Sequence, residues 1–182
     1  NILDNAAKYG GDVAMVWIDA HPDITLPGDP YPGYHAMAVT ACMGHGDAKI
    51  VAELPAAFDP SKILFVGLRN WERGEIKARQ HQYGIKHLTP EEVAADSDAL
   101  RAWLKSCGAS KVVVHFDMDV LDPAEIVAAV GTDPDGMKIE AVIRVINDIA
   151  AEKELVGLTV AEPMPRTAIR LRDMLGRLPL LE

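Results

Sequence analysis

The chain has 182 residues, 49% of them hydrophobic, which is enough for one sizeable domain with a buried core. No stretch approaches the roughly 18 apolar residues of a membrane helix, and residues 1–20 lack the pattern of a signal peptide. A net charge of −9 argues against nucleic acid as a partner, and Cys42 and Cys107, without a CxxC pattern, indicate free thiols in a reducing cytoplasm.

Apolar runs typical of buried strands alternate with helical patterns along the whole chain. Strands are expected at residues 13–18, 62–68, 111–116 and 155–160, with a weaker one at 85–88. Helices are expected at residues 2–9, 35–44, 71–83, 89–105 with a break near Asp96, 138–152 and 166–177. Strands separated by helices predict a three-layer α/β/α fold with a mostly parallel sheet. Residues 1–182 are expected to form a single domain without an interdomain linker.

Two of the expected strands are followed by residues of the types that commonly bind metal ions in proteins. The first apolar run ends in Asp19, His21 and Asp23, and the third ends in Asp117 and Asp119. In a parallel sheet the carboxyl ends of the strands share one edge, so these five side chains are expected to lie together. Four crowded carboxylates would repel one another unless cations neutralise them. Mixed carboxylate and imidazole ligands favour manganese, iron or zinc over calcium.

Each motif alone is a weak signal, because a single DxHxD or DxD sequence is also common in turns. Their combination resembles the arginase/agmatinase, or ureohydrolase, family. Five segments carry the resemblance: DAHPD at residues 19–23, YHAM at 34–37, GLRNWERGE at 67–75, HFDMDVLDP at 115–123 and VAE at 160–162. The resemblance covers nearly the whole chain and implies a single ureohydrolase-type domain with two Mn²⁺ ions per subunit.

The resemblance also implies a role for each of the five ligands. Asp19 and Asp117 would bridge the two metal ions, Asp23 would complete the shell of one, and His21 and Asp119 would complete the shell of the other. A hydroxide bridging the ions would then attack a guanidinium carbon and release urea and an amine.

Five further residues are expected to bind or process the substrate. Glu162 would hold the guanidinium through paired hydrogen bonds, and His35 would pass a proton to the leaving amine. Thr132 would support Glu162, and Glu72 and Thr25 would contact the rest of the substrate. The alternatives are that His35 is an ordinary residue at a helix start, and that Glu162 is a surface charge or a partner of the arginines at positions 166 and 170.

The chain departs from the family pattern in several places. The first metal motif of the family, GGDHS, is absent, and its histidine is expected upstream of Asn1, so the domain is expected to be N-terminally incomplete. Without that strand, an unpaired edge is expected beside the first strand of this chain. His115 replaces the serine of the family motif and is expected on the same side of its strand as Asp117, next to the metals. Thr25 and Glu72 also replace the usual Asn and Asp.

The leading hypothesis is therefore a manganese-dependent amidinohydrolase acting on a small guanidino compound. Two alternatives stay open: a related metal-dependent C–N hydrolase of the formiminoglutamase or deacetylase kind, and a catalytically impaired family member. The resemblance further implies a cytoplasmic protein that self-associates as a trimer or hexamer.

Overall fold

The structure is a computed structural model that describes residues 2–31, 33–164 and 168–181. These residues form a five-stranded parallel sheet in the order β3-β2-β1-β4-β5. The strands are β1 (Val13–Ile18), β2 (Ile63–Val66), β3 (Lys86–Leu88), β4 (Lys111–Asp117) and β5 (Glu154–Ala161). The α-helices are α1 (Ile2–Tyr9), α2 (Ala38–Cys42), α3 (Ala48–Val51), α4 (Gly74–Tyr83), α5 (Asp98–Ser106), α6 (Ile139–Glu152) and α7 (Ala168–Leu175).

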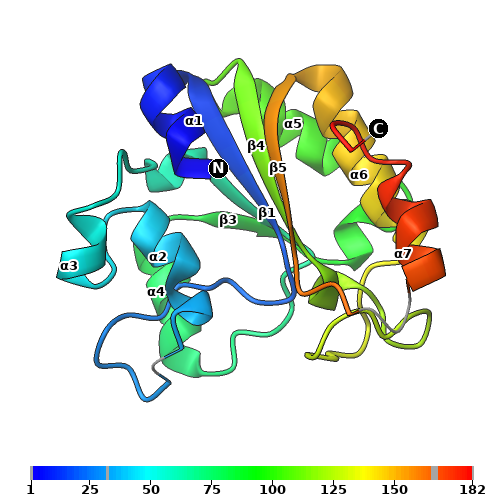
Figure 1. Cartoon of the computed structure of the whole chain (residues 1–182), viewed down its shortest axis with the longest axis horizontal. Helices are drawn as coiled ribbons and strands as arrows, with labels where there is room; N and C mark the ends of the chain where they lie inside the picture. The colour runs from blue at the N-terminus through cyan, green and yellow to red at the C-terminus, as the bar shows by residue number, and fades with distance from the viewer. Residues whose placement is uncertain (1, 32, 165–167, 182) are drawn as a thin grey trace.

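Helices cover both faces of the sheet (Figure 1). The side chains of β1 alternate between the two faces of the sheet. Ala14, Val16 and Ile18 pack with α5, α6 and α7 on one face. Met15 and Trp17 pack with α1, α2 and α4 on the other face. All six residues of β1 are buried, as a strand covered on both faces requires. The predicted three-layer α/β/α fold is therefore confirmed.

Several helices are shorter than the sequence pattern predicts. Residues 35–37 form a 3-10 turn before α2, and α4 begins at Gly74 because Arg73 is extended, with φ −143°. Thr89 and Glu92 do form a reciprocal cap, with each side chain accepting the backbone N–H of the other residue. That cap is followed only by a 3-10 turn at Glu91–Val93, and the predicted break near Asp96 precedes α5. Helix α3 was not predicted, and the start of the expected helix at 166–177 lies outside the described residues.

The expected open edge beside the first strand is wrong. β1 is the central strand, paired in parallel with β2 on one side and with β4 on the other. Within the described part of the chain, β5 lies next to β4 and pairs on one side only. Its residues are exposed or half-buried, and none is fully buried. Strand order follows from long-range pairing, which the apolar pattern of a single strand does not encode.

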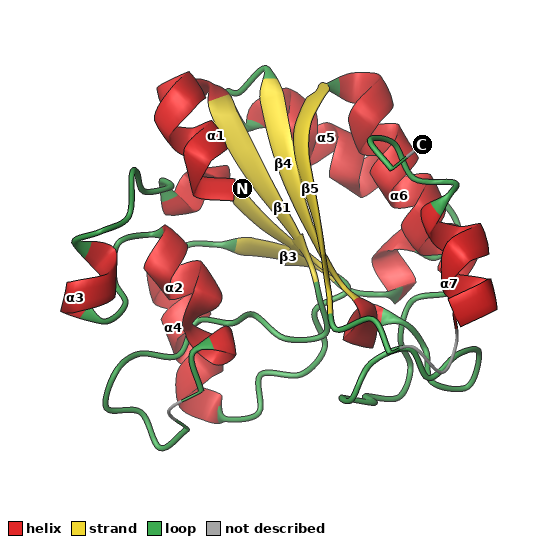
Figure 2. Cartoon of the chain, in the orientation of Figure 1, coloured by secondary structure: helices red, strands yellow, loops and turns green. Residues whose placement is uncertain are grey.

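All five strands point in one direction, so the loops that follow them gather at one end of the sheet (Figure 2). This end receives the residues that follow β1 and β4, which are the segments predicted to bind metal. Within the described residues, no helix has the length and apolar character that crossing a membrane requires.

Candidate metal centre

The ends of β1 and β4 lie side by side and open into a cavity of about 380 Å³. The register pairs Ile18 with Phe116, so the next residues along, Asp19 and Asp117, are neighbours across the two strands. The lining contains nine of the ten residues predicted for the site: Asp19, His21, Asp23, Thr25, His35, Glu72, Asp117, Asp119 and Glu162. Residues up to 143 positions apart in the sequence are thus brought together by the parallel sheet.

Short hydrogen bonds fix the carboxylates at the two strand ends. Asp19 accepts the backbone N–H of His21 at 2.7 Å and the indole N–H of Trp17 at 2.9 Å. Asp117 accepts the N–H of Asp119 at 2.9 Å, and Asp119 in turn accepts the N–H of Ala20 at 3.2 Å. The last contact ties the end of β4 to the end of β1, so the two motifs form one rigid unit.

The imidazole of His21 lies between two carboxylates. Its Nδ1 is 2.9 Å from Asp119 Oδ2, and its Nε2 is 3.1 Å from Asp133 Oδ2. Asp133 is held in turn by Asn70, whose side-chain amide donates to it at 2.7 Å. A carboxylate on the far nitrogen is the usual way in which proteins orient a metal-binding histidine. The sequence pattern did not single out Asp133, because it lies in an irregular loop with no periodicity.

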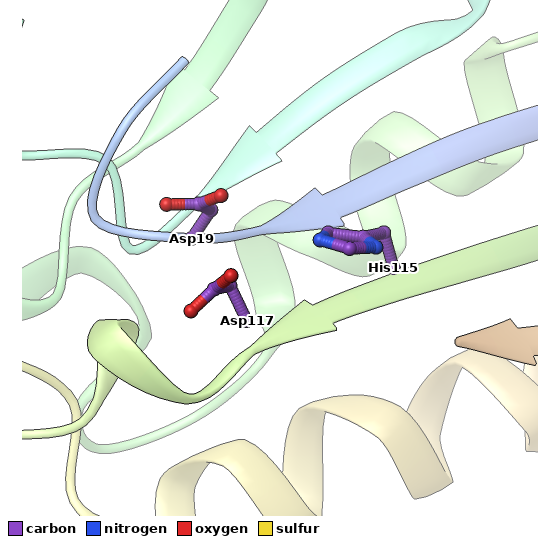
Figure 3. Close-up of side chains that lie close together, drawn as sticks. All are labelled: Asp19, His115 and Asp117. Atoms are coloured by element: carbon purple, nitrogen blue, oxygen red, sulfur yellow. The ribbon is translucent and has the colours of Figure 1, made fainter. Parts of the chain in front are cut away.

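Two groups of side chains have ligand atoms close enough to share a metal ion. In one group, Asp19, His21 and Asp119 each offer an atom within 4.8 Å of the others, and in the second group Asp19, His115 and Asp117 do the same (Figure 3). Asp19 belongs to both groups, which is the arrangement that a bridging carboxylate requires. The donor set of carboxylates and imidazoles fits a manganese, iron or zinc ion.

Burial disfavours the charged form of the carboxyl groups in this cluster. It raises the pKa of Asp117 to about 8, with the charges of Asp19 and Asp119 adding to the effect. Burial likewise raises the pKa of Asp19 to about 6 and that of Asp23 well above its usual range. Burial opposes charge on His21, but hydrogen bonds to Asp119 and Asp19 outweigh it and raise the pKa of His21 to about 11. A divalent cation would offset both the burial of these carboxylates and the repulsion among them.

Backbone strain is concentrated at this cavity. Of the five non-glycine residues with positive φ in the described chain, three line it: Asp23 at 49°, Glu72 at 57° and Glu162 at 56°. Each left-handed residue costs roughly 1 kcal/mol or more, so such residues persist where the surrounding structure enforces them and cluster at functional sites. In each case the acidic side chain is directed by a backbone turn that sequence periodicity does not reveal.

Arg69 joins three segments around the site. Its guanidinium donates to the backbone carbonyls of Asp119 at 3.0 Å, Val120 at 3.2 Å and Asp133 at 2.9 Å. Gly67, two residues earlier, has φ +84°, and a side chain there would overlap a methyl group of Val120. The segment after β2 therefore supports the turn that carries Asp119.

The remaining predicted residues take different positions. His35 is exposed at the cavity, and its Nε2 lies 3.0 Å from the Tyr31 hydroxyl. The hydroxyl of Thr25 donates to the carbonyl of Ala36 at 2.7 Å, so it anchors the loop that carries His35. Thr132 is exposed and does not line the cavity.

Glu162 was alternatively expected to pair with Arg166 or Arg170, and the structure describes one of these two arginines. Arg170 donates to the carbonyl of Glu125 at 2.9 Å, and Arg166 lies outside the described residues. Glu162 itself follows β5, is exposed at the cavity, and contributes to the raised pKa of Asp117 after burial and the nearer carboxylates. Its carboxylate is therefore part of the same electrostatic environment as the two strand ends.

The fold places the chain in a class of α/β proteins whose fold is also that of solved arginases. The arginase of Bacillus cereus superposes with a TM-score of 0.81 at 21% identity, covering 97% of this chain and 65% of that one. The arginase of Entamoeba histolytica, solved in complex with L-ornithine, gives a TM-score of 0.79 at 24% identity over 90% of this chain and 59% of that one.

Sequence comparison shows the family directly. The family model described as "Arginase family" matches residues 2–173, and the chain belongs to that family. The arginase of Entamoeba histolytica is 29% identical over 166 residues, which are 88% of this chain and 55% of that protein. The N(omega)-hydroxy-L-arginine amidinohydrolase of Streptomyces lavendulae is 31% identical over the same length, with the same coverage. The chain thus spans about half the length of the curated relatives that it matches.

Proposed function

We propose that this protein is a metal-dependent amidinohydrolase that hydrolyses a guanidino compound to urea and an amine. The observation that carries the proposal is the meeting of the five ligand side chains, from the ends of β1 and β4, in one cavity with Glu162 and His35. The names of the relatives add support, because both arginase and N(omega)-hydroxy-L-arginine amidinohydrolase denote enzymes of this reaction class.

The residues of the chain fit two Mn²⁺ ions. Asp19 and Asp117 would hold both ions, together with Asp23 for one of them and with His21 and Asp119 for the other. When bound, the two ions would supply a water molecule activated for attack on the guanidinium carbon. Asp19 is held by two N–H donors and is 3% exposed, so it is fixed in position before any metal arrives.

The other residues of the cavity would bind the substrate and move the proton. Glu162 would accept two hydrogen bonds from the planar guanidinium, an interaction stronger than a neutral pair. His35, held near Tyr31, would give a proton to the leaving nitrogen. Glu72 and Thr25 line the same cavity and would contact the remainder of the substrate, with Thr132 supporting the segment near Glu162.

The test is urea release from a panel of guanidino compounds by the Mn²⁺-loaded protein. We expect Glu162→Gln to lower kcat/KM by about 100-fold or more, because it removes a charge-assisted bond to the guanidinium. Glu53→Gln, on the exposed surface away from the cavity, is the matched control and should leave the rate unchanged. Metal-loaded protein that releases no urea from any member would refute the proposal.

The same variant separates the alternatives. A formiminoglutamase-like or deacetylase-like enzyme would keep most of its activity in Glu162→Gln, and an impaired family member would bind metal without turnover. We also propose that the protein self-associates as a trimer or hexamer, which sedimentation velocity would test. Free Cys42 and Cys107 are compatible with the cytoplasmic location that we propose.

A further inference from the structure

A third imidazole, that of His115, lies beside the metal ligands expected from the family pattern. It precedes Asp117 by two residues on β4, so both side chains emerge on the same face of the sheet. A ring nitrogen of His115 and carboxylate oxygens of Asp19 and Asp117 all lie within 4.8 Å of one another. Figure 3 shows the ring lying one step back along β4, turned toward the two carboxylates.

The ring of His115 is held in a single orientation. It stacks on the indole of Trp17, with ring centroids 3.7 Å apart and an angle of 17° between the planes. Its Nδ1 lies 2.8 Å from the hydroxyl of Thr159 on β5. Within the described chain no hydrogen bond occupies Nε2, so this nitrogen is available to a ligand. A polar partner on one ring nitrogen and a free second nitrogen is the typical setting of a metal-binding histidine.

The surroundings of His115 also suit a metal ligand, because its ring lies beside the buried carboxylates of Asp19 and Asp117. An ordinary core histidine would be complete with its stacking and its bond to Thr159, and would not need to face two buried carboxylates.

We propose that His115, through Nε2, is a ligand of the metal ion shared by Asp19 and Asp117. Because the ion itself belongs to the proposed function, this inference rests on that proposal. In the family pattern the histidine of this ion comes from the GGDHS motif, which the 182 residues do not contain. Ligand atoms about 2.1 Å from one ion lie at most about 4.2 Å apart, so the three side chains need to move closer together to share the ion.

The first experiment measures Mn²⁺ binding to the purified, metal-free protein by the EPR signal of free Mn²⁺. We expect two ions per chain in the wild type, and an affinity for one of them that falls by about 100-fold or more in His115→Asn. His45→Asn is the matched control, because His45 is exposed and stacks on Tyr83 outside the cavity lining. Unchanged affinity in His115→Asn, or a wild type that binds no Mn²⁺, would overturn the inference.

A second experiment begins with a variant that keeps His115 in place. In His21→Asn the other expected imidazole ligand is gone, and pulsed EPR of bound Mn²⁺ should still detect a coupled ¹⁴N nucleus. The coupling should disappear in the double variant His21→Asn, His115→Asn. Its absence from the single variant, or its persistence in the double variant, would contradict the assignment to His115.

The two proposals fail separately. Two ions bound with dependence on His115, but no urea released from any guanidino compound, would refute the proposed function and leave the ligand assignment standing. Urea release by both the wild type and His115→Asn, with equal Mn²⁺ affinity, would refute the ligand assignment and leave the proposed function standing.

Discussion

The raised pKa values at the strand ends predict that the metal-free protein becomes less stable as the pH rises from about 6.5 to about 8. Asp117 has a pKa of about 8 in the folded chain and near 3.8 in an unfolded one, because burial and the neighbouring carboxylates disfavour its charge. A carboxyl whose folded pKa is raised binds a proton that the unfolded state has lost, so stability falls with pH between the two values.

The size of the effect follows from about 1.36 kcal/mol per pH unit for each such group. Across this window Asp117 alone lowers the free energy of unfolding by about 2 kcal/mol. His21, with a pKa raised to about 11, contributes stability that is complete below about pH 6.5 and is lost as the pH rises toward 11, so it acts in the same direction. His115 acts in the opposite direction, but its pKa of about 4 places its titration mostly below the window.

Mn²⁺ should reverse this dependence. Metal binding requires deprotonated ligands and stabilises the folded chain by mass action, so the gain from Mn²⁺ grows as the pH rises. Urea unfolding followed by far-UV circular dichroism, with chelator and with Mn²⁺, measures both slopes. In Asp117→Asn the metal-free slope should be less steep, because one of the titrating groups is removed. Stability of the chelated wild type that is constant or increases over this window would show that the carboxylates are not buried together as described.

Three smaller perturbations test individual contacts. Gly67→Ala should cost about 2 kcal/mol or more and lower Tm by several degrees in a thermal melt, because Gly67 has positive φ and an added methyl would overlap Val120. Asp133→Asn should weaken Mn²⁺ binding by about 10-fold in an EPR titration, because His21 loses a charged partner, and an unchanged affinity would exclude an orienting role. Trp17→Phe should lower the free energy of urea unfolding by about 1–2 kcal/mol, because a buried carboxylate loses its indole donor.

The features that the sequence predicted correctly are those encoded locally. The apolar run of β1 identified a strand covered on both faces, and the ligands directly after β1 and β4 were expected at one sheet edge because parallel strands end together. Both expectations use only periodicity and the rule for strand ends. The five candidate ligands do line one cavity, which is the geometric part of the prediction.

The features that the sequence did not predict depend on long-range packing. The Thr89 cap has the pattern of a helix start and forms as expected, yet the chain makes only one turn there before α5. The open edge of the sheet was assigned to β1 because nothing within a strand specifies its neighbours. The left-handed backbone at Asp23 and Glu162 likewise depends on surrounding contacts that neither residue type indicates.

The surroundings of His21 show how a site is maintained by residues that no local motif contains. In the structure, the amide of Asn70 donates to Asp133, and the carboxylate of Asp133 lies 3.1 Å from Nε2 of His21. An acidic group is therefore present beside the imidazole, but it comes from a loop 63 residues further along the chain. Because an imidazole responds to the charge beside it and not to the position of that charge in the sequence, Asp133 can orient His21 although no local motif contains both residues.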